Sequence, residues 1–501
     1  MSTNFTIKTM IQESRRQANE QAIPEMIEWL RRVGYQPSDL NSLNLIHVAG
    51  TKGKGSTCAF ISSILCQYLP SASRNSSTQK ALTSKVGLYT SPHLRVVRER
   101  IQINNAPLSE SLFAQYFFEV WDRLETSAAQ EGRSNEKPAY FRFLTLMAFH
   151  TYLREGVDSA IIEVGIGGEH DSTNIIERPT VVGITSLGID HTPMLGDTIE
   201  EIAWHKAGIM KIGAPAFTVP QPERAMPVLR QRAEERNVEL TIVNRHPELE
   251  TVHLGLDADF QKTNASLAIA MAASHLQTLG GDISVVDRLP PEFKRGLQLA
   301  RWSGRCEIRR EGAIEWYIDG GHTLESIELV GNWLASKLTP TTTTTTTTNP
   351  GASQPPRRKR VLLFNQQTRD ASALVTALYS TLVSALSDAH PFTHTIFCTN
   401  LTFADGGYTP DLFSVNYIPV SPDMVAMSVQ RKLADTWKEL DPRADVRVVR
   451  TIEEAVGLVR GIARAGDGSE GVECLVTGSV HLVGGFLEVL ETESAGTKLS
   501  D

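Results

Sequence analysis

A chain of 501 residues is longer than one hydrophobic core normally extends, so its length predicts two domains. A hydrophobic content of 41% with 21% charged residues is typical of folded globular proteins and excludes a disordered chain. The formal net charge of −8 offers no basic field for nucleic acid, and no apolar run is long enough to span a membrane or to act as a secretory signal.

Two weaker patterns bear on the compartment. Five cysteines are odd in number and too scattered for a metal site, which predicts reduced thiols in the cytoplasm. The basic residues Lys8, Arg15 and Arg16 resemble a targeting segment, but Glu13 and Glu20 argue against one because transit peptides are poor in acids. We expect a cytoplasmic protein, and a mitochondrial form stays open.

The first three hundred residues alternate short β-branched runs with helical stretches, which predicts a parallel sheet covered by helices. The clearest strands are Leu43–Val48, Ser159–Val164 and Thr180–Thr185. Because ligands of open α/β sheets bind at the carboxyl ends of the strands, we expect the chemistry at that edge.

A second α/β set follows, so we place one domain at residues 1–298 and a smaller one at residues 299–501. Its clearest strands are Val361–Phe364, Thr395–Cys398 and Cys474–Thr477. Residues 339–356 include eight consecutive threonines and several prolines, a composition that predicts a disordered insertion within the second domain.

A glycine-rich segment, Ala49–Ser56, stands between the first strand and a helix-like run, Thr57–Tyr68. This is the setting of a phosphate-binding loop, in which backbone N–H groups converge on phosphate oxygens and a lysine reaches the outer phosphates. The match is imperfect, because Val48 replaces the first glycine and Gly55 separates Lys54 from Ser56. The alternative is a simple glycine-rich turn.

Two polar residues follow other strands. Glu163 ends a strand of apolar residues, and a carboxylate there fits a magnesium ligand better than a buried, unpaired charge. His191 ends the segment Gly188-Ile189-Asp190-His191 just past the third strand. The alternatives are an exposed glutamate and a structural histidine.

Several stretches, in order along nearly the whole chain, together resemble folylpolyglutamate synthases of the Mur ligase superfamily, and the eukaryotic branch most closely. The stretches are 47–57, 90–94, 140–145, 163–168, 187–192, 206–211, 319–322 and 477–482. The resemblance implies an N-terminal P-loop-type ATP-binding domain with a parallel sheet and a smaller C-terminal Rossmann-like α/β domain.

The resemblance also implies roles for single residues. The residues implied to bind the ATP phosphates are Lys52, Gly53, Lys54 and Gly55. Those implied to hold magnesium are Thr90, Glu163 and His191; many relatives have serine at the position of Thr90, whose hydroxyl can still coordinate. Lys206 matches a lysine that relatives often carry as a carbamate, and a monovalent cation is a further expected cofactor.

Residues of the second domain match nucleotide and substrate contacts. Arg305 and Asp319 correspond to residues that contact the nucleotide, and His322 to a histidine expected near the glutamate substrate, with Gly321 replacing the family's alanine. The candidate catalytic residues are Lys54, Lys206 and His322. The candidate substrate-binding residues are Ser91, Pro92, His93, Tyr140, Phe141 and Ser479; Phe141 and Phe143 could equally be core residues at helical spacing.

The implied activity is ATP-dependent addition of L-glutamate to tetrahydrofolate through an acyl phosphate, in a monomer. Positioning and charge neutralisation dominate such phosphoryl transfer, which suits a lysine, a glycine loop and magnesium. Dihydrofolate synthase activity, alone or combined, uses the same fold and chemistry and stays open. An alternative of another class is a nucleotide-binding regulatory module without ligase turnover.

Overall fold

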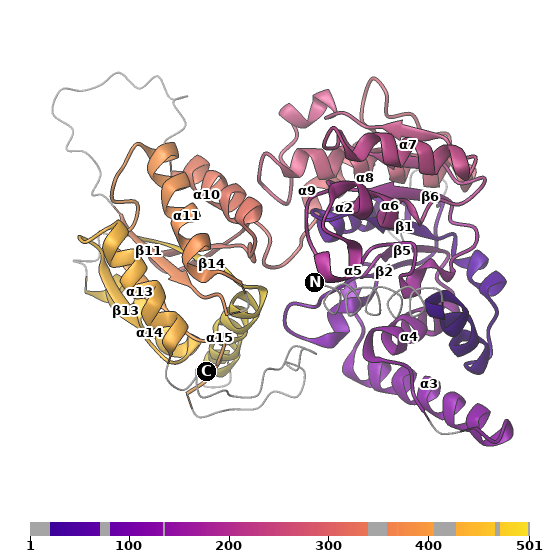
Figure 1. Cartoon of the computed structure of the whole chain (residues 1–501), viewed down its shortest axis with the longest axis horizontal. Helices are drawn as coiled ribbons and strands as arrows, with labels where there is room; N and C mark the ends of the chain where they lie inside the picture. Colours follow the sequence, from indigo (N-terminus) through magenta and orange to yellow (C-terminus); the bar gives the residue numbers. More distant parts are fainter. Residues whose placement is uncertain are drawn as a thin grey trace, which may run out of the picture. The chain divides into compact units, whose positions relative to one another are not determined.

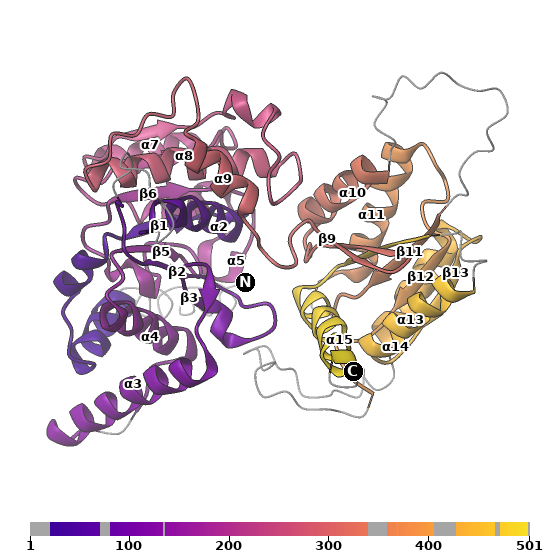
Figure 2. The same cartoon turned by 180° about the vertical axis from the view of Figure 1, so that it is seen from behind.

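The computed structural model describes residues 21–70, 81–133, 136–338, 358–367, 369–404, 427–465 and 471–498. The chain divides into two compact α/β units (Figures 1 and 2). Unit 1 comprises Met1–His93, Arg98–Gly255 and Phe260–Arg301, and unit 2 comprises Leu94–Val97, Leu256–Asp259 and Trp302–Asp501. The predicted fold class with two domains is confirmed. The expected border lay after residue 298, and the two short segments of unit 2 were not anticipated; the predicted insertion at 339–356 lies outside the described residues.

Unit 1 is built on a sheet with the strand order β4-β3-β2-β5-β1-β6-β7-β8. From β2 to β8 neighbouring strands are parallel, while β3 and β4 continue the sheet antiparallel. The strands are β1 Ile46–Ala49, β2 Val86–Tyr89, β3 Ile101–Ile103, β4 Ala106–Pro107, β5 Ser159–Glu163, β6 Val181–Ile184, β7 Ala216–Thr218 and β8 Leu240–Ile242.

Helices cover both faces of this sheet. The α-helices of the described residues include α2 Lys54–Leu65, α3 Glu110–Gln130, α4 Tyr140–Glu155, α5 Thr192–Leu195, α6 Ile199–Ala207, α7 Ala225–Glu235, α8 Gln261–Thr278 and α9 Pro291–Leu299. The 3-10 helices are η1 Pro37–Leu43, η2 Cys66–Tyr68, η3 Val97–Arg100, η4 Ser172–Ile175 and η5 Pro247–Glu250. A Cβ on Gly183 of β6 would meet Met271 of α8, whereas the neighbouring Val182 and Ile184 pack with α6 and α7 on the other face. The parallel strands are thus buried on both sides, as expected for such a sheet.

The predicted strands exist, with shifted ends. The first begins at Ile46 and not at Leu43, because Pro37 starts a 3-10 helix that continues to Leu43. The helix after the glycine-rich segment begins at Lys54, earlier than the predicted Thr57. Lys54 and Gly55 therefore lie in the first helical turn, and only residues 50–53, here called the glycine loop, stand between strand and helix.

Unit 2 has a sheet whose described strands have the order β13-β12-β11-β14-β10-β9; β9 is antiparallel to β10, and the other neighbouring strands are parallel. Its strands are β9 Glu307–Glu311, β10 Ile314–Ile318, β11 Lys359–Phe364, β12 His394–Phe397, β13 Asp445–Val448 and β14 Val472–Thr477. Its helices are α10 Leu324–Leu338, α11 Ala371–Leu386, α13 Ser428–Leu440, α14 Ile452–Arg464 and α15 Val480–Lys498.

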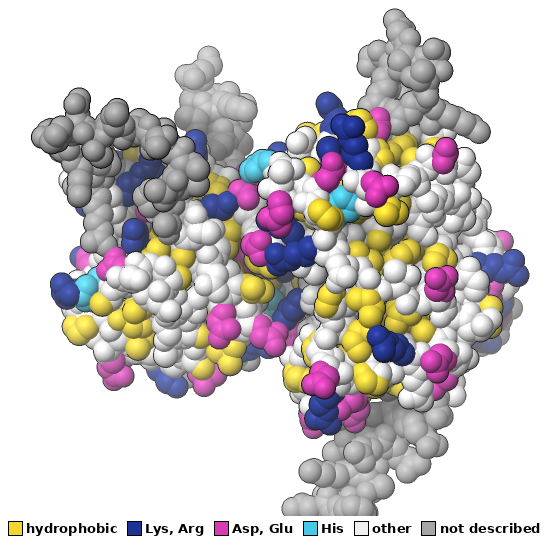
Figure 3. All heavy atoms as spheres, turned by 90° about the horizontal axis from the view of Figure 1, so that it is seen from above, with side chains coloured by type: hydrophobic (Ala, Val, Ile, Leu, Met, Phe, Trp, Pro, Cys, Tyr) yellow, Lys and Arg dark blue, Asp and Glu magenta, His cyan; other side chains and the backbone are white. Residues whose placement is uncertain are grey.

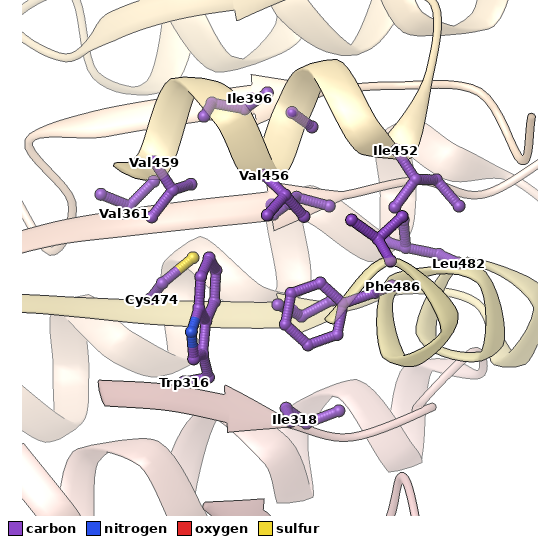
Figure 4. Close-up of a cluster of buried hydrophobic side chains, with 14 of the residues drawn as sticks. Trp316, Ile318, Val361, Ile396, Ile452, Val456, Val459, Cys474, Leu482 and Phe486 are labelled. Atoms are coloured by element: carbon purple, nitrogen blue, oxygen red, sulfur yellow. The ribbon is translucent and has the colours of Figure 1, made fainter. Parts of the chain in front are cut away.

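A hydrophobic core of unit 2 lies between one face of this sheet and helices α14 and α15 (Figure 4). Val456 and Val459 of α14 face the strands, and Phe486 of α15 packs against Trp316 of β10 with ring centroids 4.9 Å apart. The apolar side chains of the central strands are thereby removed from water, which is the main stabilising contribution in such a layered fold.

The surface bears charges of both signs. Lys, Arg, Asp and Glu side chains are interspersed on the face drawn in Figure 3. All five cysteines are free thiols, as predicted. Among the described residues, no helix combines the length and apolar character that crossing a membrane requires.

Candidate active site

The glycine loop has a backbone that only glycine adopts easily. Gly53 is the N-cap of α2 with φ of 87°, and Gly50 has φ of 148°. A Cβ on Gly50 would lie 1.8 Å from Thr185 Oγ1, and one on Gly53 would lie 2.2 Å from Asn264 Oδ1. The chain thus turns tightly from β1 into α2, and the first N–H groups of α2 have no partner within the helix.

Two lysines converge on one carbonyl oxygen of this loop. Lys54 Nζ donates to Gly50 O at 3.1 Å, and Lys206 Nζ, from α6, donates to the same oxygen at 2.7 Å. Neither ammonium forms an ion pair with a carboxylate among the described residues. Two lysine side chains beside the start of a helix therefore share a single neutral acceptor, and the charge of Lys54 together with the helix start favours an anion there.

The environment of Lys206 favours its neutral form. The residue is only 3% exposed, and burial lowers the pKa of its ammonium well below the usual value; the charge of Lys54 lowers the pKa further. Asp190 and Asp171 oppose this effect. A neutral lysine amine is a nucleophile, whereas an ordinary lysine is protonated near pH 7.

The loop that follows β6 forms hydrogen bonds with the backbone of the glycine loop. Ser186 O accepts hydrogen bonds from the backbone N–H groups of Thr51 and Lys52, each at 3.0 Å. Lys52 Nζ lies 3.4 Å from Asp190 Oδ2. The predicted site residues at Lys52–Gly55 and the segment near His191 are far apart in the sequence. They lie close together in the structure because they follow β1 and β6, which are adjacent strands.

The three predicted magnesium ligands lie after neighbouring or nearby strands of the same sheet. Thr90 follows β2 and is buried, and Glu163 ends β5, is 4% exposed and accepts a hydrogen bond from Ser91 N at 3.2 Å. His191 lies past β6, exposed, in a left-handed conformation that starts α5. Within the described ranges no three His, Cys, Asp or Glu side chains gather as a metal-binding group. The predicted set has only two such side chains, so the magnesium site stays a prediction.

Two of the predicted folate-binding residues, His93 and Tyr140, contact the same arginine, which the sequence analysis did not identify. Buried Arg100 donates through Nε to His93 Nδ1 at 2.9 Å, and its guanidinium lies 5.6 Å from the ring centroid of Tyr140. Its carbonyl accepts from Thr90 N at 3.0 Å. Arg100 was missed because it follows no glycine-rich or strand-end motif; the structure brings it to His93 through η3 and β3.

The aromatic residues at the start of α4 differ in their exposure to solvent: Tyr140 is exposed, whereas Phe143 is buried. Tyr140 is 38% exposed, and Phe141 lies against Tyr89 with ring centroids 6.1 Å apart. A Cβ on Gly165 would lie 2.5 Å from Phe141 Cζ. Phe143 is buried and packs on Phe117, so it belongs to the core, one of the two alternatives predicted for it.

A buried chain of polar groups supports the loop after β5. Thr173 Oγ1 donates to Asp171 Oδ1 at 2.6 Å and therefore accepts from His47 Nε2 at 2.8 Å, which places the ring proton of His47 on Nε2. Burial lowers the pKa of His47 to about 3, so the ring is neutral. Asp171 Oδ2 accepts from Ile166 N at 3.0 Å. The sequence signal for Asp171 would have been its position as N-cap of η4.

In unit 2 the turn after β10 is organised by Asp319. Its carboxylate accepts hydrogen bonds from Cys306 N at 2.9 Å and Gly321 N at 2.8 Å, and burial raises its pKa although Arg305 opposes this. A Cβ on Gly320 would lie 2.6 Å from Arg305 Nη1. The ring of His322 is partly buried, with Nδ1 2.8 Å from Gly320 O. Arg305, Asp319 and His322 thus belong to one turn region.

Ser479 has a structural function at the start of α15. Its Oγ accepts from the backbone N–H groups of His481 at 3.2 Å and Leu482 at 3.5 Å. Gly478 N donates to Gly321 O at 3.1 Å. The predicted motif at 477–482 therefore lies beside the Asp319 turn, and capping of α15 accounts for the hydroxyl of Ser479.

Comparison with known proteins shows the family. The chain is 46% identical over 491 residues to a folylpolyglutamate synthase of Neurospora crassa, covering 96% of this chain and 89% of that protein. It is 44% identical over 503 residues to a folylpolyglutamate synthase of Saccharomyces cerevisiae (strain FostersO), covering 98% and 85%. No family model matches the chain.

Solved structures show the same fold. The Mycobacterium tuberculosis folylpolyglutamate synthase complexed with ADP has a TM-score of 0.66 at 22% identity, covering 97% of each chain. Escherichia coli FolC in complex with DHPP and ADP has a TM-score of 0.62 at 23% identity, covering 93% of this chain and 94% of that one. With relatives this similar over nearly its whole length, the chain belongs to the folylpolyglutamate synthase family.

Proposed function

We propose that this chain joins L-glutamate to the γ-carboxylate of tetrahydrofolate and that Lys52, Gly53, Lys54 and Gly55, in the glycine loop and the first turn of α2, bind the ATP phosphates. The observation that carries the proposal is the ammonium group of Lys54 on Gly50 O, which forms no ion pair with a carboxylate among the described residues. A triphosphate supplies the missing negative charge. The N–H groups at the start of α2 add donors for its oxygens.

The reaction proceeds in two displacements. An oxygen of the folate γ-carboxylate attacks the terminal phosphorus of ATP, the bond to ADP breaks, and an acyl phosphate forms. The amine of glutamate then attacks the acyl carbon, inorganic phosphate leaves with the bonding electrons, and the amine loses a proton. Lys54 and Lys52 contribute positive charge where negative charge develops on the phosphoryl oxygens.

The residues predicted to hold magnesium include oxygen donors of the kind that this ion prefers. Glu163 offers a buried carboxylate and Thr90 a buried hydroxyl at the ends of adjacent parallel strands. When bound, the ion would neutralise charge on the phosphates. His191 would complete the set, and a monovalent cation stays a prediction.

For Lys206 we propose a carbamate. Carbamate formation requires a neutral amine, and burial lowers the pKa of Lys206 in the direction that supplies one. The resulting carbamate would supply a fixed negative charge and oxygen donors of the kind that magnesium prefers. Lys54 lies beside it on the same carbonyl, which supports a site built for negative charge.

The remaining residues are proposed as substrate contacts. Tyr140, Phe141 and His93, with Ser91 and Pro92, would border the folate, and Arg100 would hold the His93 ring in the required tautomer. Arg305 and Asp319 would contact the nucleotide, and His322 the glutamate, with Ser479 close to that turn. We further propose a monomer in the cytoplasm.

A product assay tests the function. Purified protein with magnesium, ATP, tetrahydrofolate and labelled glutamate should yield a ladder of glutamylated folates. Lys54→Ala should lower turnover about 10²-fold at saturating ATP, as expected for loss of one preorganised charge at the transferring phosphate. Lys294→Ala serves as control, because Lys294 of α9 forms a partly exposed ion pair with Glu248 of η5. Wild-type turnover in Lys54→Ala would show that the phosphates bind elsewhere.

Phosphate release separates the alternatives. A ligase should release phosphate only when both the folate and glutamate are present, whereas a regulatory nucleotide-binding module should hydrolyse ATP without either. Replacing tetrahydrofolate by dihydropteroate tests dihydrofolate synthase activity, which the residues around the glycine loop do not distinguish.

A further inference from the structure

The helix end that carries Lys206 is in direct contact with the loop after Glu163. A Cβ on Gly168 would lie 2.6 Å from His205 O, and one on Gly208 would lie 2.3 Å from the Cα of Glu169. Glu169 N donates to His205 O at 2.7 Å. The two segments therefore touch backbone to backbone, and two glycines make that approach possible.

An arginine at the end of α7 satisfies the carbonyls that follow α6. Arg236 Nη1 donates to Gly208 O at 2.7 Å and to Met210 O at 2.9 Å. Asn174 Nδ2 also donates to Gly208 O, at 3.1 Å, and to Glu169 O at 3.0 Å. These donors complete the C-terminal end of a nine-residue helix and set the direction in which the chain leaves it.

The carboxylate of Glu169 joins these parts together. Its Oε2 accepts from Arg236 Nη2 at 2.6 Å and from Arg232 Nη2. The guanidinium of Arg232 lies 4.6 Å from the ring centroid of Trp204, which is on α6 two residues before Lys206. Charge-assisted hydrogen bonds of partly buried groups hold geometry more firmly than exposed ion pairs do.

We propose that Arg236, with Glu169 and Arg232, positions Lys206: the three side chains hold the end of α6 against the loop after Glu163 so that Lys206 Nζ reaches Gly50 O. Gly50 O is 2.7 Å from Nζ, and a fixed helix end keeps the long lysine side chain within reach of that contact. The effect on catalysis rests on the proposed function of Lys206, whereas the positioning itself does not.

Two measurements on Arg236→Gln test the proposal. Glutamine is too short and lacks the charge to serve Gly208 O, Met210 O and Glu169 together. We expect kcat to fall roughly 10²-fold, because a small displacement of a group at the reaction centre has effects of that order, while KM for the folate changes little. Site-specific mass spectrometry in bicarbonate-free buffer should show severalfold faster labelling of Lys206 by an amine reagent, because its amine no longer occupies the buried contact and becomes accessible to the reagent.

Matched variants separate positioning from general loss of structure. Arg236→Lys keeps one charged donor and should restore part of kcat and part of the protection of Lys206; Glu169→Gln should change both in the same direction as Arg236→Gln, but less. Arg230→Gln alters an exposed arginine on the same helix and should match wild type. These variants still decide the question if Arg236→Gln does not fold.

The outcomes are distinguishable. Unchanged labelling of Lys206 and unchanged kcat in folded Arg236→Gln or Glu169→Gln would overturn the proposal. A wild-type protein that makes no glutamylated product would refute the proposed function alone, because the labelling result still reports whether Arg236 positions Lys206.

Discussion

Lys206 has a backbone carbonyl as its hydrogen-bond partner where most buried lysines have a carboxylate. Burial and neighbouring cations lower the pKa of its ammonium well below 10.5. Between that lowered pKa and the ordinary value, the unfolded chain binds the proton more readily than the folded chain. The free energy of unfolding should therefore rise with pH across this window.

The pH dependence can be measured against a variant. At pH values below the lowered pKa of Lys206, the folded protein carries the full free-energy cost of burying the ammonium charge. This cost disappears as the pH approaches about 10.4, the ordinary pKa of a lysine. Urea unfolding of wild type and Lys206→Met from neutral to alkaline pH should give curves that diverge, with wild type gaining up to about 1.4 kcal/mol per pH unit. Parallel curves would contradict the lowered pKa.

Glu163 is a buried carboxylate that ends a central strand, next to the loop that touches α6. Glu163→Gln keeps the size of the side chain and an acceptor for Ser91 N but removes the charge. If Glu163 binds magnesium, the concentration needed for half-maximal turnover should rise at least about tenfold, with little change in thermal midpoint. An unchanged magnesium titration would remove Glu163 from the ion's ligands. Glu155→Gln, at a partly exposed ion pair of α4, is the control.

At the scale of elements, the start of α2 depends on one residue without a side chain. Gly53 caps the helix with positive φ, and Asn264 of α8 occupies the space where a Cβ would be. Asn264 also donates to Gln261, which donates to Ser56 Oγ at 3.2 Å. The glycine loop and the first turns of two helices are therefore packed as one assembly.

This packing predicts a specific interaction between two substitutions. Gly53→Ala should destabilise the protein by roughly 1–3 kcal/mol, through the strained backbone and the clash with Asn264. Adding Asn264→Gly should recover the part due to the clash and leave the part due to positive φ. Additive destabilisation in a double-mutant cycle of thermal unfolding would contradict the contact. Gly457→Ala, whose Cβ would meet nothing within 4 Å, is the control for insertion of a methyl group.

At the scale of the whole molecule, two units have separate hydrophobic cores and should unfold in separate steps. Asp319→Ala removes the acceptor of two backbone N–H groups in unit 2. An unsatisfied buried donor costs about 1–3 kcal/mol, so calorimetry should show the transition of unit 2 at lower temperature and that of unit 1 unchanged. Leu146→Ala, in the core of unit 1, should shift the other transition. A shift of both transitions by either variant would show that the two units unfold together.

The sequence by itself determined the class of the fold and predicted where the chemistry takes place. Short apolar runs followed by glycine or polar residues predicted β1, β5 and β6. A parallel strand is buried on both faces, so its sequence is a continuous apolar run that can be recognised locally. The glycine-rich segment with Lys54 after such a strand was recognisable for the same local reason. The family resemblance extended this to Lys206 and to the Asp319 turn, and comparison with relatives confirmed the family.

What only the tertiary structure decided was which groups meet. Nothing local to residues 50 and 206 indicates that one oxygen accepts from two lysines, since the contact joins positions 156 residues apart. No sequence motif marks Arg100, Arg236 or Glu169. Their contacts are with residues of other helices, strands and loops, which the local sequence does not reveal. The start of α2 was misplaced for a related reason: glycines predict a loop by propensity, whereas packing of α2 against the sheet and α8 extends the helix to Lys54.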